Sequence, residues 1–453
     1  MRQIFQFSTK KSIVFLLVAF FTITGLSGQE DPDHFELDDL IAEALENNYD
    51  IRIGQADLEI AEMNNTIGNA GMLPSVIWES NFSNSFNDRS GSTSQTGNLQ
   101  NGVRLNWLLF NGFSAHVRKD RLENLEELSE GNLAMVVENT IQAVVLAYYR
   151  TIYEQEQLEL LREVMGLSED RLEYVKERVA LGAATSYDTL QARTAYLSDK
   201  ASFMEQEVSV ISAKRELKYL IGMSEGERLK LNGELEFEPK DYALDQMLDR
   251  MENNNQSIRN QYLNLALVEN QKILEKRSRY PSLSANAGAE HSMQPESLND
   301  NDFQTPGDSQ DSPTTYSTDD YMTYYVNFSL SFTLFDGDRI NRNIQIAEVE
   351  ETIERTNLEE MKHRLKNRLM NIYDTYRVRK ELVEVGKENM ETSRVNMELS
   401  EERFRAGTIN SFNFRDVQLE YLEASMNYFR SILNLIDTHT ELVRITGGIV
   451  EEF

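Results

Sequence analysis

The chain has 453 residues, no cysteine, and a formal net charge of −30 at pH 7 from 75 acidic and 45 basic residues. The lack of cysteine excludes a disulfide framework, a thiolate metal site and a lipidated N-terminal cysteine. The acidic balance argues against nucleic acid as a partner, because phosphates require a basic surface.

The first 28 residues have the pattern of a secretory signal peptide. Arg2, Lys10 and Lys11 form a basic start, and an apolar run follows from Ile13 to Ile23. This run is shorter than the ~20 residues that a helix needs to span a bilayer, which favours a signal over the alternative of a membrane anchor. We therefore expect the mature chain in the periplasm or beyond.

Most of the mature chain is an internal repeat. Residues 37–76 align without a gap with residues 244–283, and ten of the forty positions are identical. Further on, residues 177–222 align with residues 402–447. Each copy has the order helix, β-hairpin, long helix and helix, which indicates duplication of a whole domain. The predicted parts are a signal peptide at 1–28, a first repeat at 29–222, a linker at 223–243, a second repeat at 244–447 and a short tail at 448–453.

Two very long helices are predicted at 115–180 and 339–405, from apolar residues at helical spacing. Each would be about 100 Å long. The helices predicted at 38–71 and 186–221 would together reach about 105 Å. A long helix would therefore pair with two half-length helices stacked end to end, which predicts a tall cylinder. An ordinary bundle of helical hairpins is the alternative.

Four segments between the helices have the period-two pattern of β-strands. They lie near 76–86, 103–109, 282–290 and, most clearly, 322–334. The apolar face of the last segment consists of Met322, Tyr324, Val326, Phe328, Leu330, Phe332 and Leu334. The segments would form two hairpins.

The loops of these hairpins, at 87–101 and 291–320, are polar. Long polar loops beside strands with one apolar and one polar face are typical of an outer-membrane barrel. A soluble sheet packed on the helices is the alternative. Four strands cannot close a barrel, and lipid does not tolerate open edges, so copies of the chain would have to share one barrel. Two copies would give eight strands, and three would give twelve.

The sequence resembles the TolC family of outer-membrane efflux proteins over essentially all of the mature chain. The similarity is carried by two motifs in register, one from Glu177 to Ala192 and one from Glu402 to Val417. The resemblance implies an α+β membrane protein, with the linker in an equatorial region. It would be a homotrimer whose 12-stranded barrel, with four strands per protomer, continues into a long periplasmic α-helical barrel. The expected location is the outer membrane of a Gram-negative bacterium.

The resemblance also implies a passive exit duct for small molecules such as drugs and toxic compounds. Such a duct would bind a periplasmic adaptor (a membrane fusion protein) and an inner-membrane transporter of the RND, ABC or MFS type. One alternative is the outer-membrane component of a type I protein secretion system. Another is a coiled-coil structural protein of the envelope. The five histidines are scattered without metal-ligand spacing, and we expect no enzymatic activity, metal or cofactor.

Three sets of site residues follow from the resemblance. The adaptor-binding tip would contain Leu181, Gly182, Ala406 and Gly407. The aperture would be gated by Asp188, Asn413, Asp416 and Phe404. The lipid-facing strand would present Tyr324, Val326, Phe328, Leu330, Phe332 and Leu334. The sequence departs from the family pattern where a carboxylate is replaced by Asn413, a tyrosine by Phe404 and an arginine by Ile409.

Overall fold

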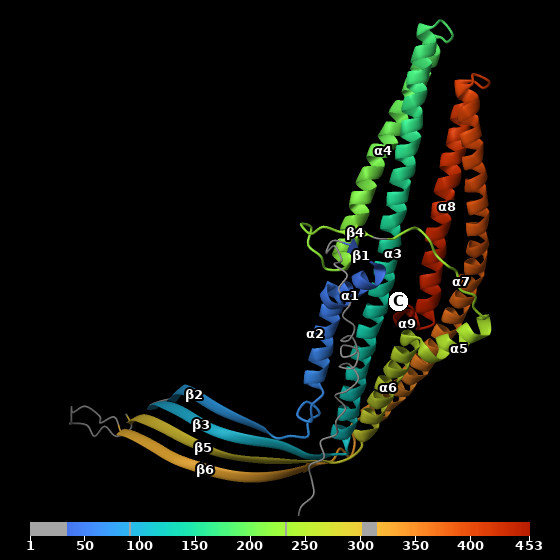
Figure 1. The fold of residues 1–453 in the computed structure, drawn as a ribbon. Helices are drawn as coiled ribbons and strands as arrows, with labels where there is room; N and C mark the ends of the chain where they lie inside the picture. Colours follow the sequence, from blue (N-terminus) through green and yellow to red (C-terminus); the bar gives the residue numbers. More distant parts are fainter. Residues whose placement is uncertain (1–33, 90–91, 232, 301–314) are drawn as a thin grey trace, which may run out of the picture.

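A computed structural model describes residues 34–89, 92–231, 233–300 and 315–453. The predicted signal peptide at 1–28 lies outside the described residues. A four-stranded sheet lies at one end of two long helical hairpins (Figure 1). The elements in chain order are β1 (His34–Phe35), α1 (Leu37–Asn47), α2 (Tyr49–Asn64), β2 (Ser75–Arg89), β3 (Ser92–Asn111), α3 (Ser114–Ala180), α4 (Ser186–Leu220), β4 (Lys230–Leu231), α5 (Leu244–Asn254), α6 (Gln256–Arg277), β5 (Ser282–Asp300), β6 (Thr315–Ser331), α7 (Arg339–Arg405), α8 (Ser411–Ile445) and α9 (Ile449–Glu452).

The two predicted long helices are confirmed. Helices α3 and α7 have 67 residues each, which makes each about 100 Å long. Helix α3 packs against α2 and α4 on one side and against α6 and α8 on the other. Helix α7 packs against α6 and α8. The layer therefore runs from α2 and α4, through α3, to α6 and α8, and ends with α7.

The half-length helices meet end to end at a joint that both repeats build in the same way. Asn48 accepts hydrogen bonds from two N–H groups in the first turn of α2 and donates one to the Leu220 carbonyl at the end of α4 (2.7 Å). Asn255 likewise caps α6 and donates to the Ile445 carbonyl of α8 (2.9 Å). One side chain thus satisfies unpaired groups at the ends of two helices.

A glycine completes each joint. Gly222 and Gly447 follow α4 and α8 with φ of 71° and 70°. A Cβ at either position would lie 2.6 Å from the carbonyl oxygen of Asn47 or Asn254. Close backbone approach and positive φ both require glycine here. The joint therefore explains why these asparagines and glycines recur in the two repeats.

The prediction of one helix over 38–71 is wrong. The backbone is extended at Asn48 (ψ 134°), and α2 ends at Asn64. The Asn48 side chain caps the first turn of α2, which starts a new helix instead of continuing α1. The turn after α2 lies against the start of α3, where Lys119 donates to Asn65 (2.6 Å). The matching of helix lengths therefore gave too long a helix before the first hairpin.

The sheet has the order β2-β3-β5-β6, and all its neighbouring strands are antiparallel. The four predicted strands are confirmed, but they are longer than predicted. Of the expected loops at 87–101 and 291–320, residues 87–89, 92–101, 291–300 and 315–320 are strand, because backbone pairing continues where polar residues on both faces remove the period-two signal. The rest of both expected loops, 90–91 and 301–314, lies outside the described residues. At the other end β6 stops at Ser331, so Phe332 and Leu334 lie beyond the strand.

The largest core cluster lies at the level of the first joint. It brings Leu40 of α1 and Val144 of α3 together with Ile221 and with Ile436 of α8, each fully buried. Leu229, from the predicted linker at 223–243, packs into the same cluster. The joint is therefore also the level at which the largest core cluster connects the two repeats.

Candidate functional site

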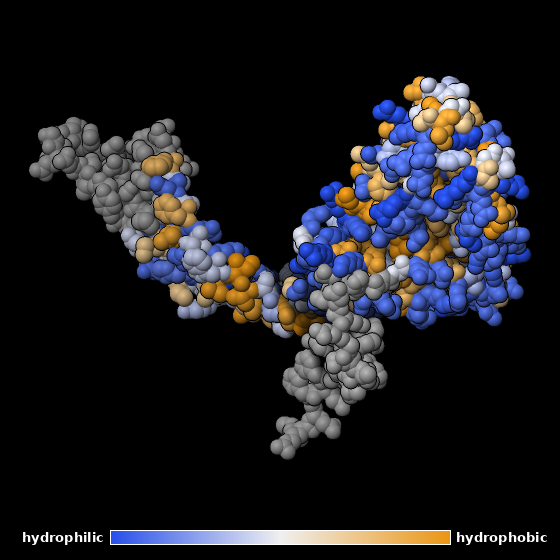
Figure 2. Space-filling model, turned by 45° about the horizontal axis from the view of Figure 1, so that its top comes forward, coloured by the Kyte–Doolittle hydropathy of each residue, from blue (hydrophilic) through white to orange (hydrophobic). Residues whose placement is uncertain are grey.

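One face of the sheet is apolar and exposed. On β6 the exposed fractions are 74% for Tyr324, 68% for Phe328 and 70% for Leu330. On β2, Trp78 and Phe82 are exposed to a similar degree. Figure 2 shows groups of apolar side chains along the described part of the sheet, with hydrophilic side chains between them. Val326 on the strand, and Phe332 and Leu334 just after it, are also exposed.

The opposite face carries charge. Arg104 Nε donates to the Tyr325 hydroxyl (3.1 Å), and Arg104 Nη1 lies 3.3 Å from a Glu79 carboxylate oxygen. Tyr325 lies against Gly288, where a Cβ would come within 2.7 Å of the hydroxyl oxygen. A sheet with one apolar and one charged face suits a wall between lipid and water.

The sheet has two open edges in one chain. Strands β2 and β6 are its first and last strands. Because the four strands alternate in direction, β2 and β6 run antiparallel to each other. A β6 strand can therefore pair with the β2 strand of another copy in the same antiparallel manner.

The far ends of the helical hairpins form the tip. Gly182 and Gly407 have φ of 75° and 72°, and each ends a 67-residue helix. Leu181 is 83% exposed, and Gly182, Ala406 and Gly407 are also exposed. The structure thus brings the four predicted tip residues to two equivalent turns at the same end of the molecule (Figure 1).

The predicted aperture carboxylates begin the return helices. Asp188 accepts hydrogen bonds from the Thr185 N–H (2.8 Å) and the Thr185 hydroxyl (2.7 Å). These two bonds lower the pKa of Asp188. Asn413 and Asp416 are exposed near the start of α8. Asp188 therefore caps α4 within its own chain.

Phe404 does not face solvent. It is 4% exposed and stacks on Phe414, with ring centroids 5.0 Å apart and an interplanar angle of 8°. The Tyr174 ring of α3 meets Phe404 edge-on, also at 5.0 Å. Ile409 packs against the same cluster. Phe404 therefore joins the first hairpin, α3 and α4, to the second hairpin, α7 and α8.

A buried ion pair between the same two hairpins was missed by the sequence analysis. The Arg415 guanidinium on α8 makes two hydrogen bonds to the Asp199 carboxylate on α4, both 2.6 Å. Their side chains are only 18% and 7% exposed. Ser168 of α3 also donates to Asp199. Asp199 looks like one more charge on a helix face, and Arg415 is one of several polar residues in its motif, so no periodic signal marks the pair.

A second arginine lies beside this pair. Arg171 of α3 is 3% exposed and donates to the Ser411 carbonyl at 3.4 Å. Burial, and then repulsion from Arg415, lower its pKa to about 10. The two hairpins are thus held together near the tip by a compact charged cluster in addition to the aromatic one.

Within the described residues, no three His, Asp or Glu side chains are grouped so that they could hold a metal ion. Among the helices described above, none is both long and apolar enough to cross a bilayer.

A family comparison matches both repeats. The profile of outer membrane efflux proteins aligns with residues 40–223 and again with residues 247–448. The two matched segments correspond to the two copies found in the sequence. No curated protein sequence matches the chain.

Solved structures share the fold at low sequence identity. CusC, in a study of folding and transmembrane channel formation, is 15% identical with a TM-score of 0.72; the match covers 94% of this chain and 96% of CusC. The CmeC outer membrane channel of Campylobacter jejuni is 15% identical with a TM-score of 0.72, over 91% of this chain and 85% of CmeC. The open MtrE outer membrane channel of Neisseria gonorrhoeae is 18% identical with a TM-score of 0.68, over 91% of this chain and 89% of MtrE.

Proposed function

The chain belongs to the outer membrane efflux protein family, and on that premise we propose that three copies form a passive duct for small molecules. The protein is a transport protein of the Gram-negative outer membrane that extends into the periplasm, and it is not an enzyme. An inner-membrane transporter would supply the energy, and a periplasmic adaptor would connect it to the tip. We also propose that residues 1–28 are the signal that directs export.

The observation that carries the proposal is the exposed apolar face of a sheet with two open edges. From Met322 to Phe332 the chain advances ten residues, or about 33 Å when extended. At the usual tilt of ~40° this gives an apolar band about 25 Å high, the height of an outer-membrane barrel wall. Lipid would cover this face, and other copies would close the edges.

The helical layer has matching open sides. Within one chain, α3 packs against α8, where Ile436 is fully buried. The counterpart of Ile436 in the first repeat is Ile211 on α4, 225 positions earlier, and it is 48% exposed. On α7, Val385 is 62% exposed, whereas its counterpart Leu160 on α3 is 6% exposed. The duplication therefore leaves α4 and α7 each without the neighbour that the equivalent helix has, and a ring of copies would supply both.

The number of copies rests on the family resemblance together with barrel size. Eight strands from two copies would leave an interior filled by side chains. Twelve strands from three copies would leave room for a lumen. We therefore prefer a trimer for a conducting duct.

The proposed duct is tested by reconstitution and by deletion. Purified protein in planar bilayers should give channels, and a deletion strain should become more sensitive to compounds such as bile salts, dyes or antibiotics. Absence of channels from correctly assembled protein would contradict the duct. Unchanged sensitivity together with lost secretion of one protein would favour the type I secretion alternative.

The aperture is proposed from position rather than from contacts. Three copies of Asp188 and Asp416 around a narrow pore would repel one another and favour cations. The double variant Asp188→Ala, Asp416→Ala should therefore conduct more and select cations less in single-channel recordings. Asn413 would line the same opening without charge, whereas Phe404 would act from the packed interior by holding the two hairpins together. Unchanged conductance and selectivity would remove the carboxylates from this role.

A further inference from the structure

The two repeats provide a template for the contact between copies at the level of the joint. Helix α3 meets the joint of α6 and α8 in its own chain. Helix α7 is the counterpart of α3, and α2 and α4 are the counterparts of α6 and α8. The contacts on α3 therefore indicate which residues of α7 would face the α2 and α4 joint of a neighbouring copy.

Two polar contacts define the template. Asn260 of α6 donates to Asn132 of α3 (2.9 Å), at a place where Gly131 lets the helices come close. Arg444, at the end of α8, donates to Asn139 of α3 (3.4 Å). The two contacts lie on either side of the joint.

The equivalent residues in the other repeat are exposed. Asn260 and Arg444 correspond to Ile53 and Tyr219, which are 60% and 62% exposed. Asn132 and Asn139 correspond to Asn357 and Arg364 of α7, which are also exposed. A tyrosine and an isoleucine on one open side thus occupy the positions that would meet an asparagine and an arginine on the other open side.

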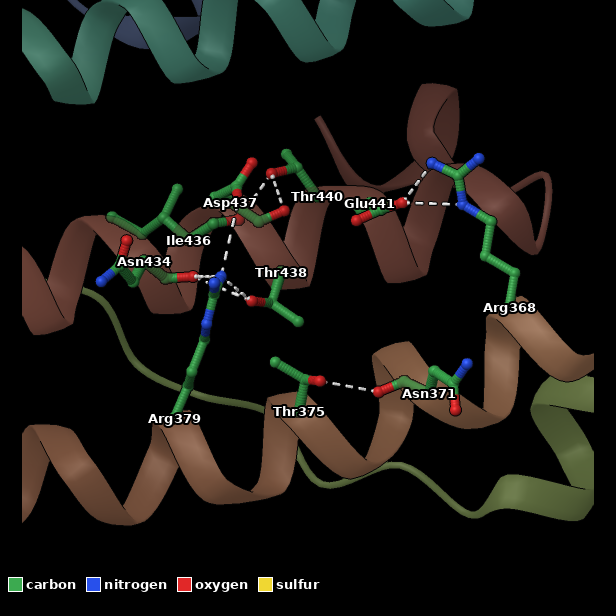
Figure 3. Close-up of polar contacts among 10 residues, drawn as sticks. All are labelled: Arg368, Asn371, Thr375, Arg379, Asn434, Ile436, Asp437, Thr438, Thr440 and Glu441. Carbon is green, nitrogen blue, oxygen red and sulfur yellow. Dashed lines mark hydrogen bonds and ion pairs between the residues drawn. The ribbon is translucent and has the colours of Figure 1, made fainter.

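A groove lies at the same height on α7. It has a volume of about 600 Å³ and lies between α7 and α8. Figure 3 shows that Arg368 and Arg379 reach from α7 to α8, where they bind Glu441 (2.5 Å) and the Asn434 carbonyl (2.5 Å). The lining residues include Arg364, Asn367, Asn371, Thr375, Asp437 and Glu441.

We propose that this groove is the docking site for Tyr219 of an adjacent copy, with Ile53 of that copy against Asn357. The inference rests on the ring assembly proposed above, and it specifies which residues of adjacent copies meet. Tyrosine and arginine are the residue types that most often dominate interface energies, and a guanidinium binds well over a tyrosine ring. Asp50 and Glu360 correspond to Ser257 and Met135, which are in contact, so the two carboxylates would approach and repel each other. Arg364 already pairs with Glu360 (2.9 Å), and this cation reduces the repulsion.

Cysteine cross-linking tests the register directly, because the chain has no native cysteine. In the double variant Tyr219→Cys, Arg364→Cys, each copy offers one thiol on each open side. A short bifunctional maleimide applied to outer-membrane fractions should convert the monomer band into covalent dimers and trimers. In the matched control Tyr219→Cys, Val385→Cys, the second thiol lies on the same exposed side of α7 but about 32 Å further toward the tip, and little cross-linking is expected.

A second control tests the contact within one chain from which the proposal is derived. The pair Asn139→Cys, Arg444→Cys should cross-link within one chain, because these residues are in contact there. If this pair reacts and the protein is trimeric, but Tyr219→Cys, Arg364→Cys gives no dimers, the proposed docking is wrong. The proposal of a trimeric duct is not affected by that result. Stronger cross-linking of the Val385→Cys pair would also overturn it. A protein that stays monomeric in the membrane would overturn both proposals.

Discussion

Arg415 carries a charge that the packed hairpins exclude from water. Replacing it with alanine would leave Asp199 buried without its partner, and such losses cost about 3–5 kcal/mol. We expect Arg415→Ala to unfold at a clearly lower temperature by circular dichroism. The matched control is Arg405→Ala, whose arginine is 67% exposed and pairs with Glu401, and this change should cost less than about 1 kcal/mol. Equal effects of the two changes would contradict a stabilising role for the buried pair.

We expect His439 to make the stability of the joint region depend on pH. It is 1% exposed, its Nε2 lies 2.7 Å from the Tyr242 hydroxyl, and the Phe237 ring packs against it. Burial lowers its pKa from 6.5 to about 4; Glu452 acts against this shift and Lys240 adds to it. Between these two pH values the unfolded chain binds a proton that the folded chain does not, so stability falls as the pH falls from 6.5 to 4.

The size of this effect gives a test. A shift of this size corresponds to roughly 3 kcal/mol, lost between pH 6.5 and 4. His439→Phe should keep the ring packing and remove this proton, so its unfolding temperature should change less over that range than that of the wild type. Parallel pH profiles for the two proteins would show that other groups cause the dependence.

At the scale of elements, the joint depends on one asparagine per repeat. Asn255→Ala removes the cap of α6 and the bond to α8, and we expect a loss of about 1–3 kcal/mol, measured by chemical denaturation. Asn253→Ala, two residues away and exposed, should change stability by less than about 0.5 kcal/mol. The same contrast is expected for Asn48. A loss no larger than that of Asn253→Ala would mean that water replaces both bonds.

The elements that could be predicted are those with a periodic signal. Alternation from Met322 to Leu330 predicted β6 and its apolar face, and apolar spacing predicted α3 and α7 almost to the residue. The break at Asn48 was missed, because a capping asparagine inside a helical pattern resembles any polar surface residue. The extensions of β3 and β5 were missed because polar residues on both faces give no alternation.

The sequence predicted where the residues of the candidate site lie, but not which residues they contact. The repeat placed the turns at Gly182 and Gly407 at the same end of the molecule. It could not show that Asp188 caps its own helix or that Phe404 is buried, since both depend on how the two hairpins pack. The pairing of Asp199 with Arg415 joins positions 216 residues apart and leaves no local pattern.

At the scale of the whole molecule, the sheet predicts how the protein responds to charge in the membrane. Phe328→Arg places a cation near the middle of the apolar band and should cost about 2–4 kcal/mol per copy. Asn327→Arg, one residue away on the polar face, should be tolerated. The fraction of protein in the outer membrane measures both. Equal loss for the two variants would contradict the assigned lipid face.

The two joints also fix how far the tip lies from the middle of the molecule. Both lie at the same level on helices of 67 residues each, so the distance from joint to tip is set by α4 and α8 together with the matching parts of α3 and α7. Removing one heptad from a single helix would shift the tips out of line. Removing one heptad from all four helices between the joints and the tip would shorten the distance from joint to tip by about 10 Å. The contacts between the deletion and the sheet would stay in place. The depth of periplasm that the protein crosses is therefore adjustable only in matched steps.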